Sequence, residues 1–325
     1  MSVRIGTSGW SYPGGRGTWN GVFYPPKGAR VRGFDELEFY ARWFDVVEVN
    51  STFYGQPRPQ VTAKWAERTP PGFEFAVKLY QKFTHPAMFR EAVAAAAPET
   101  EAAWLYQTGL VRQADVDEFR TGIAPLADAG KLGPLLVQFP PSFTVSSEAI
   151  DYLGWLLRTL ADYSLAVELR HRSWSDQARD TADLLDAYAA TWVLIDEPKF
   201  EFSIRQHWGP HRPLVEPAEA PADPPTGALA YMRFHGRNAA EWWRHAAAED
   251  RYNYLYTERE LRPFAAAARS AGATLKKAYL FFNNHFSAQG VANAVQLRRQ
   301  LGQPVPEPLP PDLARAFPWL EAPPT

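Results

Sequence analysis

The sequence contains no cysteine, and this absence excludes disulfide bonds, thiolate zinc sites, iron–sulfur ligation and cysteine nucleophiles. It also lacks an apolar run near residues 1–10 that would suit a signal peptide, and any later run of membrane-spanning length. We therefore expect a cytoplasmic protein without membrane contact. A strong charge of one sign is missing too. The net charge of −2 gives no general attraction to nucleic acid or acidic membranes, so an anion site must be a local cluster.

The residues that are present are those of an ordinary globular protein, with 46% hydrophobic and 22% charged side chains in 325 residues. No change in composition divides the chain, so we predict a single domain over residues 1–302. Residues 303–325 are rich in proline, and we expect this C-terminal tail to be frayed or to lie along the surface.

Eight short apolar segments alternate with segments of mostly helical character. The predicted strands lie within 3–10, 45–50, 73–78, 134–139, 165–170, 191–196, 229–234 and 277–282. The predicted helices are 34–44, 60–68, 146–161, 176–190, 258–271 and 288–301, with a serine cap before the third. A helical insertion over 87–130 follows the third strand, and an irregular loop over 199–227 follows the sixth. The alternation predicts an α/β fold with a parallel sheet, and the count of eight favours a (β/α)8 TIM-type barrel.

Polar residues gather at the carboxyl ends of these strands, where barrel enzymes place their active sites. In four strands they recur two residues apart, so both members of a pair share one face. The pairs are Glu48/Asn50, Glu168/Arg170, Arg233/His235 and Asn283/His285. Other strands contribute Thr7, Ser8, Lys78, Gln138 and Asp196. We expect these side chains to line the mouth of the barrel.

Each of these residues also has a structural interpretation. Glu168 and Arg170 suit an ion pair that fixes a loop, because a lone buried charge is costly. Asn50 and Gln138 suit loop-fixing hydrogen bonds, and Asp196 suits a turn cap. His171 fits a structural role as well as that of a general base. It is the recurrence of such residues at equivalent strand ends that favours a functional site.

The same strand ends carry motifs of a known family. They are Gly6-Thr7-Ser8-Gly9-Trp10, Phe23-Tyr24-Pro25, Val47-Glu48-Val49-Asn50-Ser51-Thr52-Phe53-Tyr54, Phe75-Ala76-Val77-Lys78 with Thr84-His85, Gln138-Phe139-Pro140-Pro141-Ser142-Phe143, Glu168-Leu169-Arg170-His171 with Ser173-Trp174, Tyr231-Met232-Arg233-Phe234-His235-Gly236 with 252–256, and Phe281-Phe282-Asn283-Asn284-His285 with Asn293-Ala294. With them the chain resembles the domain-of-unknown-function 72 family, the YecE-like proteins; Arg172 is a minor departure from the pattern. The resemblance implies a TIM-type barrel distantly similar to sugar isomerases and endonuclease-IV-like barrels, and it brings no established activity.

Our first functional hypothesis is an enzyme that uses general acid/base chemistry on a small polar anion, such as a phosphorylated or carboxylated sugar. The candidate catalytic residues are Glu168, Glu48, His235 and Asp196. The candidate anion-binding cations are Lys78, Arg170 and Arg233, because guanidinium and ammonium groups bind phosphate and carboxylate. Further substrate contacts are expected from Asn50, Gln138 and Asn283, and from walls of Trp10, Tyr54 and Trp174. This hypothesis expects Glu168→Gln to fold normally and to lose turnover.

Two alternatives remain open. A divalent-metal-dependent sugar isomerase or endonuclease-IV-like hydrolase would draw on Glu48, Glu168, Asp196, His235 and His285 for Mn, Mg or Zn, although the three cations compete in the same mouth. A nucleic-acid-binding protein without turnover would use Arg233, Arg237, Trp242, Trp243, Arg244 and Arg251, against the overall acidity. We assign no cofactor and no metal ligand, and the oligomeric state is open.

Overall fold

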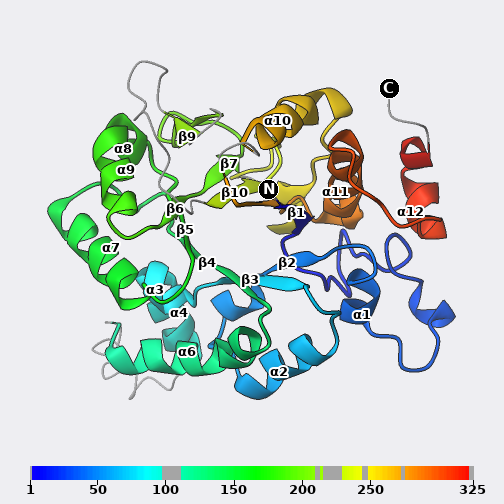
Figure 1. Ribbon diagram of the computed structural model, residues 1–325, viewed down its shortest axis with the longest axis horizontal. Coiled ribbons are helices and arrows are strands. Elements are labelled where there is room, and N and C mark those ends of the chain that lie inside the picture. Colours follow the sequence, from blue (N-terminus) through cyan, green and yellow to red (C-terminus); the bar gives the residue numbers. More distant parts are fainter. Residues whose placement is uncertain are drawn as a thin grey trace.

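The strands of the computed structural model form two parallel sheets at the centre of the molecule (Figure 1). The described residues are 2–96, 111–208, 213–214, 229–243, 248–271 and 275–321. The first sheet has the order β1 (Ser2–Thr7), β11 (Lys277–Phe282), β10 (Leu229–Phe234), β7 (Leu194–Asp196). The second has the order β2 (Val46–Val49), β3 (Glu74–Lys78), β4 (Leu132–Gln138), β5 (Leu165–Glu168), β6 (Thr191–Trp192). Only the short pair β8 (His207–Trp208) and β9 (Pro213–Leu214) is antiparallel among the strands described. The predicted α/β fold with parallel strands is thus confirmed.

The two sheets are connected at two places. On one side a parallel bridge joins Ser8 to Glu48, and the backbone N–H of Gly9 donates to the Glu48 carbonyl (2.7 Å). Gly6 permits this approach, because a Cβ there would lie 2.3 Å from the carbonyl oxygen of Val46. On the other side only Val193 separates β6 from β7, so the predicted strand 191–196 is interrupted at that residue.

The longer helices lie around the outside of the strands (Figure 1). The α-helices are α1 (Glu36–Tyr40), α2 (Pro59–Glu67), α3 (Gln81–Thr84), α4 (Pro86–Ala96), α6 (Gln113–Asp128), α7 (Ser147–Thr159), α8 (Arg172–Asp176), α9 (Ala178–Asp186), α10 (Glu258–Ala271), α11 (Gln289–Gln300) and α12 (Pro311–Ala316). Short 3-10 helices are η1 (Lys27–Ala29), η2 (Ser51–Phe53), η3 (Ala248–Tyr252), η4 (Phe286–Ala288) and η5 (Pro318–Glu321). The predicted cap before α7 is confirmed, since Ser146 Oγ accepts from the N–H of Ala149 (3.1 Å). None of the helices described is long and apolar enough to cross a bilayer.

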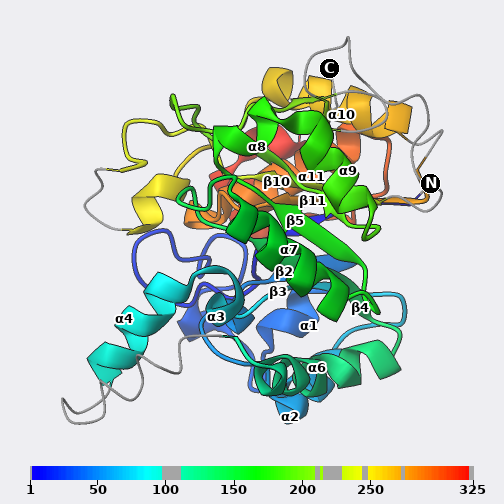
Figure 2. The same ribbon diagram turned by 90° about the vertical axis from the view of Figure 1, so that its left-hand side faces the viewer.

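The segment 87–130, which we expected to be an insertion, is helical at both ends. Its C-terminal helix, α6, belongs to the outer layer of helices that surrounds the strands. Helix α6 lies beside α2 (Figure 2), where Thr62 Oγ1 donates to the carbonyl of Gly122 (2.7 Å). It buries Phe119 and Ile123 against the core. The expected insertion therefore shrinks to α4 and the residues after it, of which 97–110 lie outside the described residues. Much of the expected irregular loop 199–227 also lies outside them.

The C-terminal tail is packed rather than frayed over much of its length. Leu313 in α12 and Leu320 in η5 are 0% and 1% exposed, and both belong to the hydrophobic cluster that contains the strands. Proline starts α12 at its first position, where the missing N–H costs no helical hydrogen bond. Of the two expectations for the tail, residues 309–320 follow the one in which it lies along the surface, and not the frayed one.

Candidate functional site

A cavity of about 530 Å³ opens at the carboxyl ends of the strands. Many of the residues predicted for the site line it: Trp10, Asn50, Tyr54, Lys78, Gln138, Arg170, Arg233 and Asn283. They come from seven different strand ends and the loops that follow, as strand periodicity predicts. The structure thus brings these residues together around one space.

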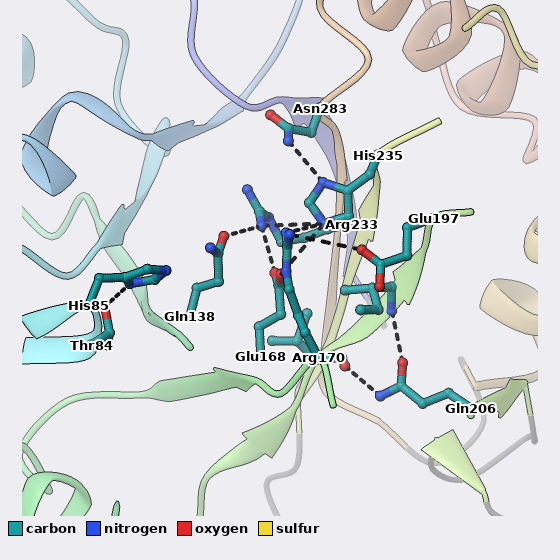
Figure 3. Close-up of polar contacts among 12 residues, drawn as sticks. Thr84, His85, Gln138, Glu168, Arg170, Glu197, Gln206, Arg233, His235 and Asn283 are labelled. Carbon is teal, nitrogen blue, oxygen red and sulfur yellow. Dashed lines mark hydrogen bonds and ion pairs between the residues drawn. The ribbon is translucent and has the colours of Figure 1, made fainter. Parts of the chain in front are cut away.

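Arg233 forms the centre of the cavity floor and is tied to two carboxylates. Its Nε and Nη2 donate to the two oxygens of Glu48 (2.9 and 2.8 Å). Its Nη1 donates to Glu168 Oε2 (2.6 Å) and Gln138 Oε1 (2.8 Å) (Figure 3). The Tyr231 hydroxyl adds a hydrogen bond to Glu48 Oε2 (2.7 Å). Since Glu48 and Glu168 are 0% exposed, both act as buried counter-ions beneath the floor.

Glu168 is shared by two arginines. Arg170 Nε donates to its other oxygen, Oε1 (2.6 Å). Burial by itself would raise the pKa of Glu168, but the charges of Arg233 and Arg170 hold that pKa well below its ordinary value of 4.5. The carboxylate therefore stays ionised, and both its oxygens are bonded. It cannot accept a proton from a ligand until one of these ion pairs opens.

His235 is buried behind the two arginines and is neutral. Burial, followed by the charges of Arg233 and Arg170, lowers its pKa to about 3. Asn283 Nδ2 lies 2.9 Å from His235 Nδ1, and His235 Nε2 lies 3.2 Å from Arg170 Nη2 and 3.6 Å from Glu168 Oε1. His235 lies behind the residues that line the cavity, and it orients the charged groups from beneath.

Lys78 is a buried amine on the wall of the cavity. Its Nζ lies 4.0 Å from the centre of the Phe53 ring, and within the described residues no hydrogen-bond acceptor or carboxylate pairs with it. Burial, followed by the charge of Arg233, lowers the pKa of Lys78 to about 7. Close to neutral pH the amine therefore exists in both protonation states.

Glu197 was not predicted, yet it is the carboxyl that lines the cavity. Its Oε2 lies 3.9 Å from Arg170 Nη1 (Figure 3). Burial raises the pKa of Glu197, although Arg170 opposes the shift. A partly desolvated carboxyl next to the cavity is suited to give or take a proton. The neighbouring position was predicted instead, because the break at Val193 obscured which residue of Asp196 and Glu197 turns inward.

Asp196 and Trp174 are not brought to the cavity. Asp196 accepts hydrogen bonds from Arg237 Nε (2.9 Å) and the Tyr256 hydroxyl (2.6 Å). Trp174 is 1% exposed, and its Nε1 donates to the carbonyl of Phe143 (2.8 Å). His171 is a helix cap, accepting from the N–H of Ser173 (3.1 Å). Asp196 and His171 thus have the structural roles that the sequence left open for them, and Trp174 is a buried side chain beneath a loop rather than a wall of the cavity.

Three further lining residues were not predicted for the site because they lie in the segments between strands: Tyr12, His85 and Tyr252. Trp242 and Arg251, which were named for the nucleic-acid alternative, line the cavity as well. Arg251 lies 5.9 Å from the Trp242 ring centre and 6.0 Å from that of Tyr252. His285, named for the metal alternative, stacks on Tyr12 with ring centres 4.4 Å apart, and burial lowers its pKa to about 4.

The ligand set of the metal alternative is not assembled. Glu48, Glu168 and Asp196 each bind guanidinium groups, and the described part of the chain contains no cluster of three histidine or acidic side chains suited to a metal ion. The residues described therefore do not fit a divalent ion.

The residues of the nucleic-acid alternative are divided. Arg233 and Arg237 are neutralised by carboxylates, whereas Trp242, Trp243 and Arg251 line the cavity. Arg244 is outside the described residues.

Comparisons with known proteins agree on one family. The chain is 27% identical over 310 residues to UPF0759 protein YunF of Bacillus subtilis, covering 91% of this chain and 93% of that protein. It is 29% identical over 170 residues to UPF0759 protein YecE of Escherichia coli, covering 52% and 48%. A DUF72 family protein from Thermotoga maritima matches with a TM-score of 0.70 and 31% identity over 93% of this chain and all of that one (100%). A DUF72 family protein from Enterococcus faecalis has the same fold, with a TM-score of 0.71, 24% identity and coverage of 95% and 98%. These names specify no reaction or ligand. The family model described as "Protein of unknown function DUF72" matches residues 4–315, and the chain therefore belongs to this family.

Proposed function

We propose that this protein is an enzyme that binds a small polar anion in the cavity and acts on it by general acid/base chemistry. The observation that carries the proposal is the excess of unpaired positive charge on the wall. Lys78 and Arg251 have no carboxylate partner within the described residues, and Arg170 turns one edge toward the cavity. Phosphate and carboxylate groups are the ligands that such an arrangement favours.

We also propose that the two sheets form one closed (β/α)8 barrel, which carries this site. Support comes from the bridge between Ser8 and Glu48 at one junction of the sheets and from the single residue, Val193, at the other. One hydrophobic cluster runs through both sheets and includes Leu313 of the tail. We therefore propose one domain, the barrel of residues 1–302, with the tail packed against it.

The proton-transferring group in our proposal is Glu197, and not Glu168 or Glu48. The latter two are held as counter-ions of Arg233 below the floor, whereas Glu197 lines the cavity and has a raised pKa because it is buried. Asn50 also lines the cavity, and its Oδ1 is buried without a hydrogen-bond partner in the part of the chain described. A hydroxyl of a sugar-like ligand would satisfy it.

Sulfate is a suitable probe of the anion site, because its charge is constant between pH 6 and pH 8. We expect calorimetric titration to give binding at pH 6 that weakens at pH 8 as Lys78 loses its proton. Lys78→Met and Arg251→Met each lose roughly 10- to 100-fold, the value of a charge-assisted hydrogen bond. Lys78→Arg keeps the binding at both pH values, and Lys64→Met, at an exposed lysine, is the matched control.

Glu197→Gln provides a second test. It removes a negative charge next to Arg170, so sulfate should bind more tightly than to the wild type at pH 8. No sulfate binding at pH 6, or binding that Lys78→Met and Arg251→Met leave unchanged, would overturn the proposed function.

A nucleotide or nucleic acid is a second candidate ligand, because the cavity rim is aromatic. Trp243 is 54% exposed, and its ring lies 5.7 Å from Phe200 and 5.9 Å from Phe202. Tyr54 is 73% exposed on the lining. Base stacking on such rings contributes about 1–3 kcal/mol per base. AMP would then bind more tightly than sulfate, and Trp243→Ala would remove the difference. A gel shift with single-stranded DNA at low salt that detects no complex would restrict the candidate to mononucleotides.

A further inference from the structure

We infer that Lys78 is a nucleophile that forms an imine with an aldehyde or ketone group of the substrate, so that the ligand is an anion that also carries a carbonyl. The inference rests on the proposed function for its anion site, and it adds a covalent step that the acid/base proposal does not contain.

Comparison with the two other buried lysines, Lys82 and Lys131, and with the exposed Lys199 singles out Lys78. Lys82 Nζ donates to both oxygens of Asp115 (2.8 and 2.9 Å). Lys131 Nζ donates to the carbonyls of Ala66 (2.6 Å) and Thr69 (2.5 Å), and Lys199 Nζ to those of Ile195 and Ile204 (3.5 and 3.3 Å). Lys78 is as buried as Lys82 and Lys131, at 9% exposed against 8% for each, but its amine has no acceptor in the described residues and faces the cavity. A buried amine without a partner is costly unless a ligand uses it.

The position of the amine is fixed by its surroundings. Lys78 ends β3, and Thr52 Oγ1 donates to its carbonyl (2.6 Å), which anchors the backbone. The Phe53 ring supports the ammonium group from one side. Arg170 and Arg233 disfavour a further positive charge close by, and with burial they lower the pKa of Lys78 to about 7. About half of the amine is then free base at pH 7, against roughly one in a few thousand for an ordinary lysine.

The step balances without any other reactant. The nitrogen lone pair of Lys78 attacks the carbonyl carbon, a C–N bond forms, and the carbonyl oxygen becomes the hydroxyl of a carbinolamine. The C–O bond then breaks, and the oxygen leaves as water with the two protons that the amine has given up. Nothing is oxidised or reduced. The arginines of the wall hold the anionic group, so the substrate class is an oxo acid or a phosphorylated aldehyde or ketone.

Glyoxylate, which joins the smallest aldehyde to a carboxylate, is the probe for this step. The full-length protein is incubated with glyoxylate and sodium cyanoborohydride at pH 7, and peptide mass spectrometry locates carboxymethyl groups. We expect Lys78 to be modified at least 10-fold faster than any other lysine. The rate should rise with a midpoint near pH 7 and fall when sulfate is added. Lys131 and Lys199 are the internal controls, and Lys78→Arg should lose the fast modification.

The outcomes separate the two proposals. Sulfate binding without selective modification of Lys78 overturns the imine and leaves the proposed function intact. Fast modification of Lys78 without sulfate binding supports the nucleophile and overturns the anion site. Modification of Lys78 at the rate of surface lysines, with no sulfate binding, overturns both. Because pH dependence and sulfate protection are measured on the wild type, the test does not depend on the folding of a variant.

Discussion

Replacing Glu168 by glutamine keeps the shape of a buried side chain and removes the charge that Arg170 and Arg233 share. Both ion pairs are short, at 2.6 Å, and the carboxylate is 0% exposed. Breaking a buried ion pair costs roughly 3–5 kcal/mol, because the remaining charge is left without compensation. Arg233 keeps both bonds to Glu48, so we expect a loss at the lower end, about 3 kcal/mol. With an unfolding entropy of about 0.7 kcal/mol/K for a chain of this length, Tm falls by about 4 °C.

Urea unfolding followed by tryptophan fluorescence, together with calorimetry, would measure this loss. Glu67→Gln, at an exposed position, is the matched control and should change stability by no more than about 0.5 kcal/mol. Adding Arg170→Met to Glu168→Gln rebalances the charge, so the double variant should lose less than the sum of the single variants.

The pH dependence of unfolding tests separately whether the ionised Glu168 side chain stabilises the folded protein. The pKa of Glu168 is lower in the folded protein than its ordinary 4.5. Its stabilisation is therefore complete above pH 4.5 and is lost as the pH falls through the folded-state value. The gap between wild type and Glu168→Gln should shrink on acidification. A variant as stable as the wild type at pH 7 would refute the assignment of Glu168 as a buried counter-ion.

Three further predictions follow from other contacts. Tyr231→Phe removes one hydrogen bond to Glu48, which keeps both bonds to its arginine; we expect urea unfolding to detect a loss of about 1–2 kcal/mol, and no loss would mean that the hydroxyl does not bind the carboxylate. His235 has a pKa of about 3, so its ring signals in NMR spectra should be constant between pH 5 and pH 8, whereas a midpoint near 6.5 would contradict its burial between cations. Truncation after residue 308 exposes the surface that Leu313 covers, so calorimetry should find a Tm several degrees lower, and an unchanged Tm would mean that the tail adds no stability.

The α/β fold with parallel strands was predictable from the sequence because strand and helix periodicity is a local property. Residues 229–234 and 277–282 were expected as strands and are β10 and β11 with the same bounds. The strand at 191–196 was less accessible. Its interruption at Val193 depends on contacts such as that of Gln206 Nε2 with the Val193 carbonyl (2.8 Å), which no local pattern encodes.

The sequence predicted many of the residues that face the cavity, but not which of the predicted residues lie buried beneath its floor. Alternation along a strand identifies the inward face, and Gln138 and Arg170 accordingly reach the cavity. The alternation does not show how deep below the cavity a side chain lies. Glu168 was therefore expected to be an acid/base group whose replacement by glutamine folds normally and loses turnover. Its ion pairs with Arg170 and Arg233 lead us to expect that the same replacement also lowers stability. The charge state of such a group depends on residues from distant strands, here Arg233.

The ion pairs of Arg233 also bear on how the molecule unfolds. Arg233 belongs to the first sheet, and Glu48 and Glu168 belong to the second. Separating the sheets would break these ion pairs while the three charged groups are still surrounded by apolar side chains and not yet hydrated. Neither half of the molecule can then open alone at low free energy, and the sheets should lose their structure in a single cooperative transition. The network beneath the cavity floor thus couples the stability of the two sheets to the geometry of the cavity.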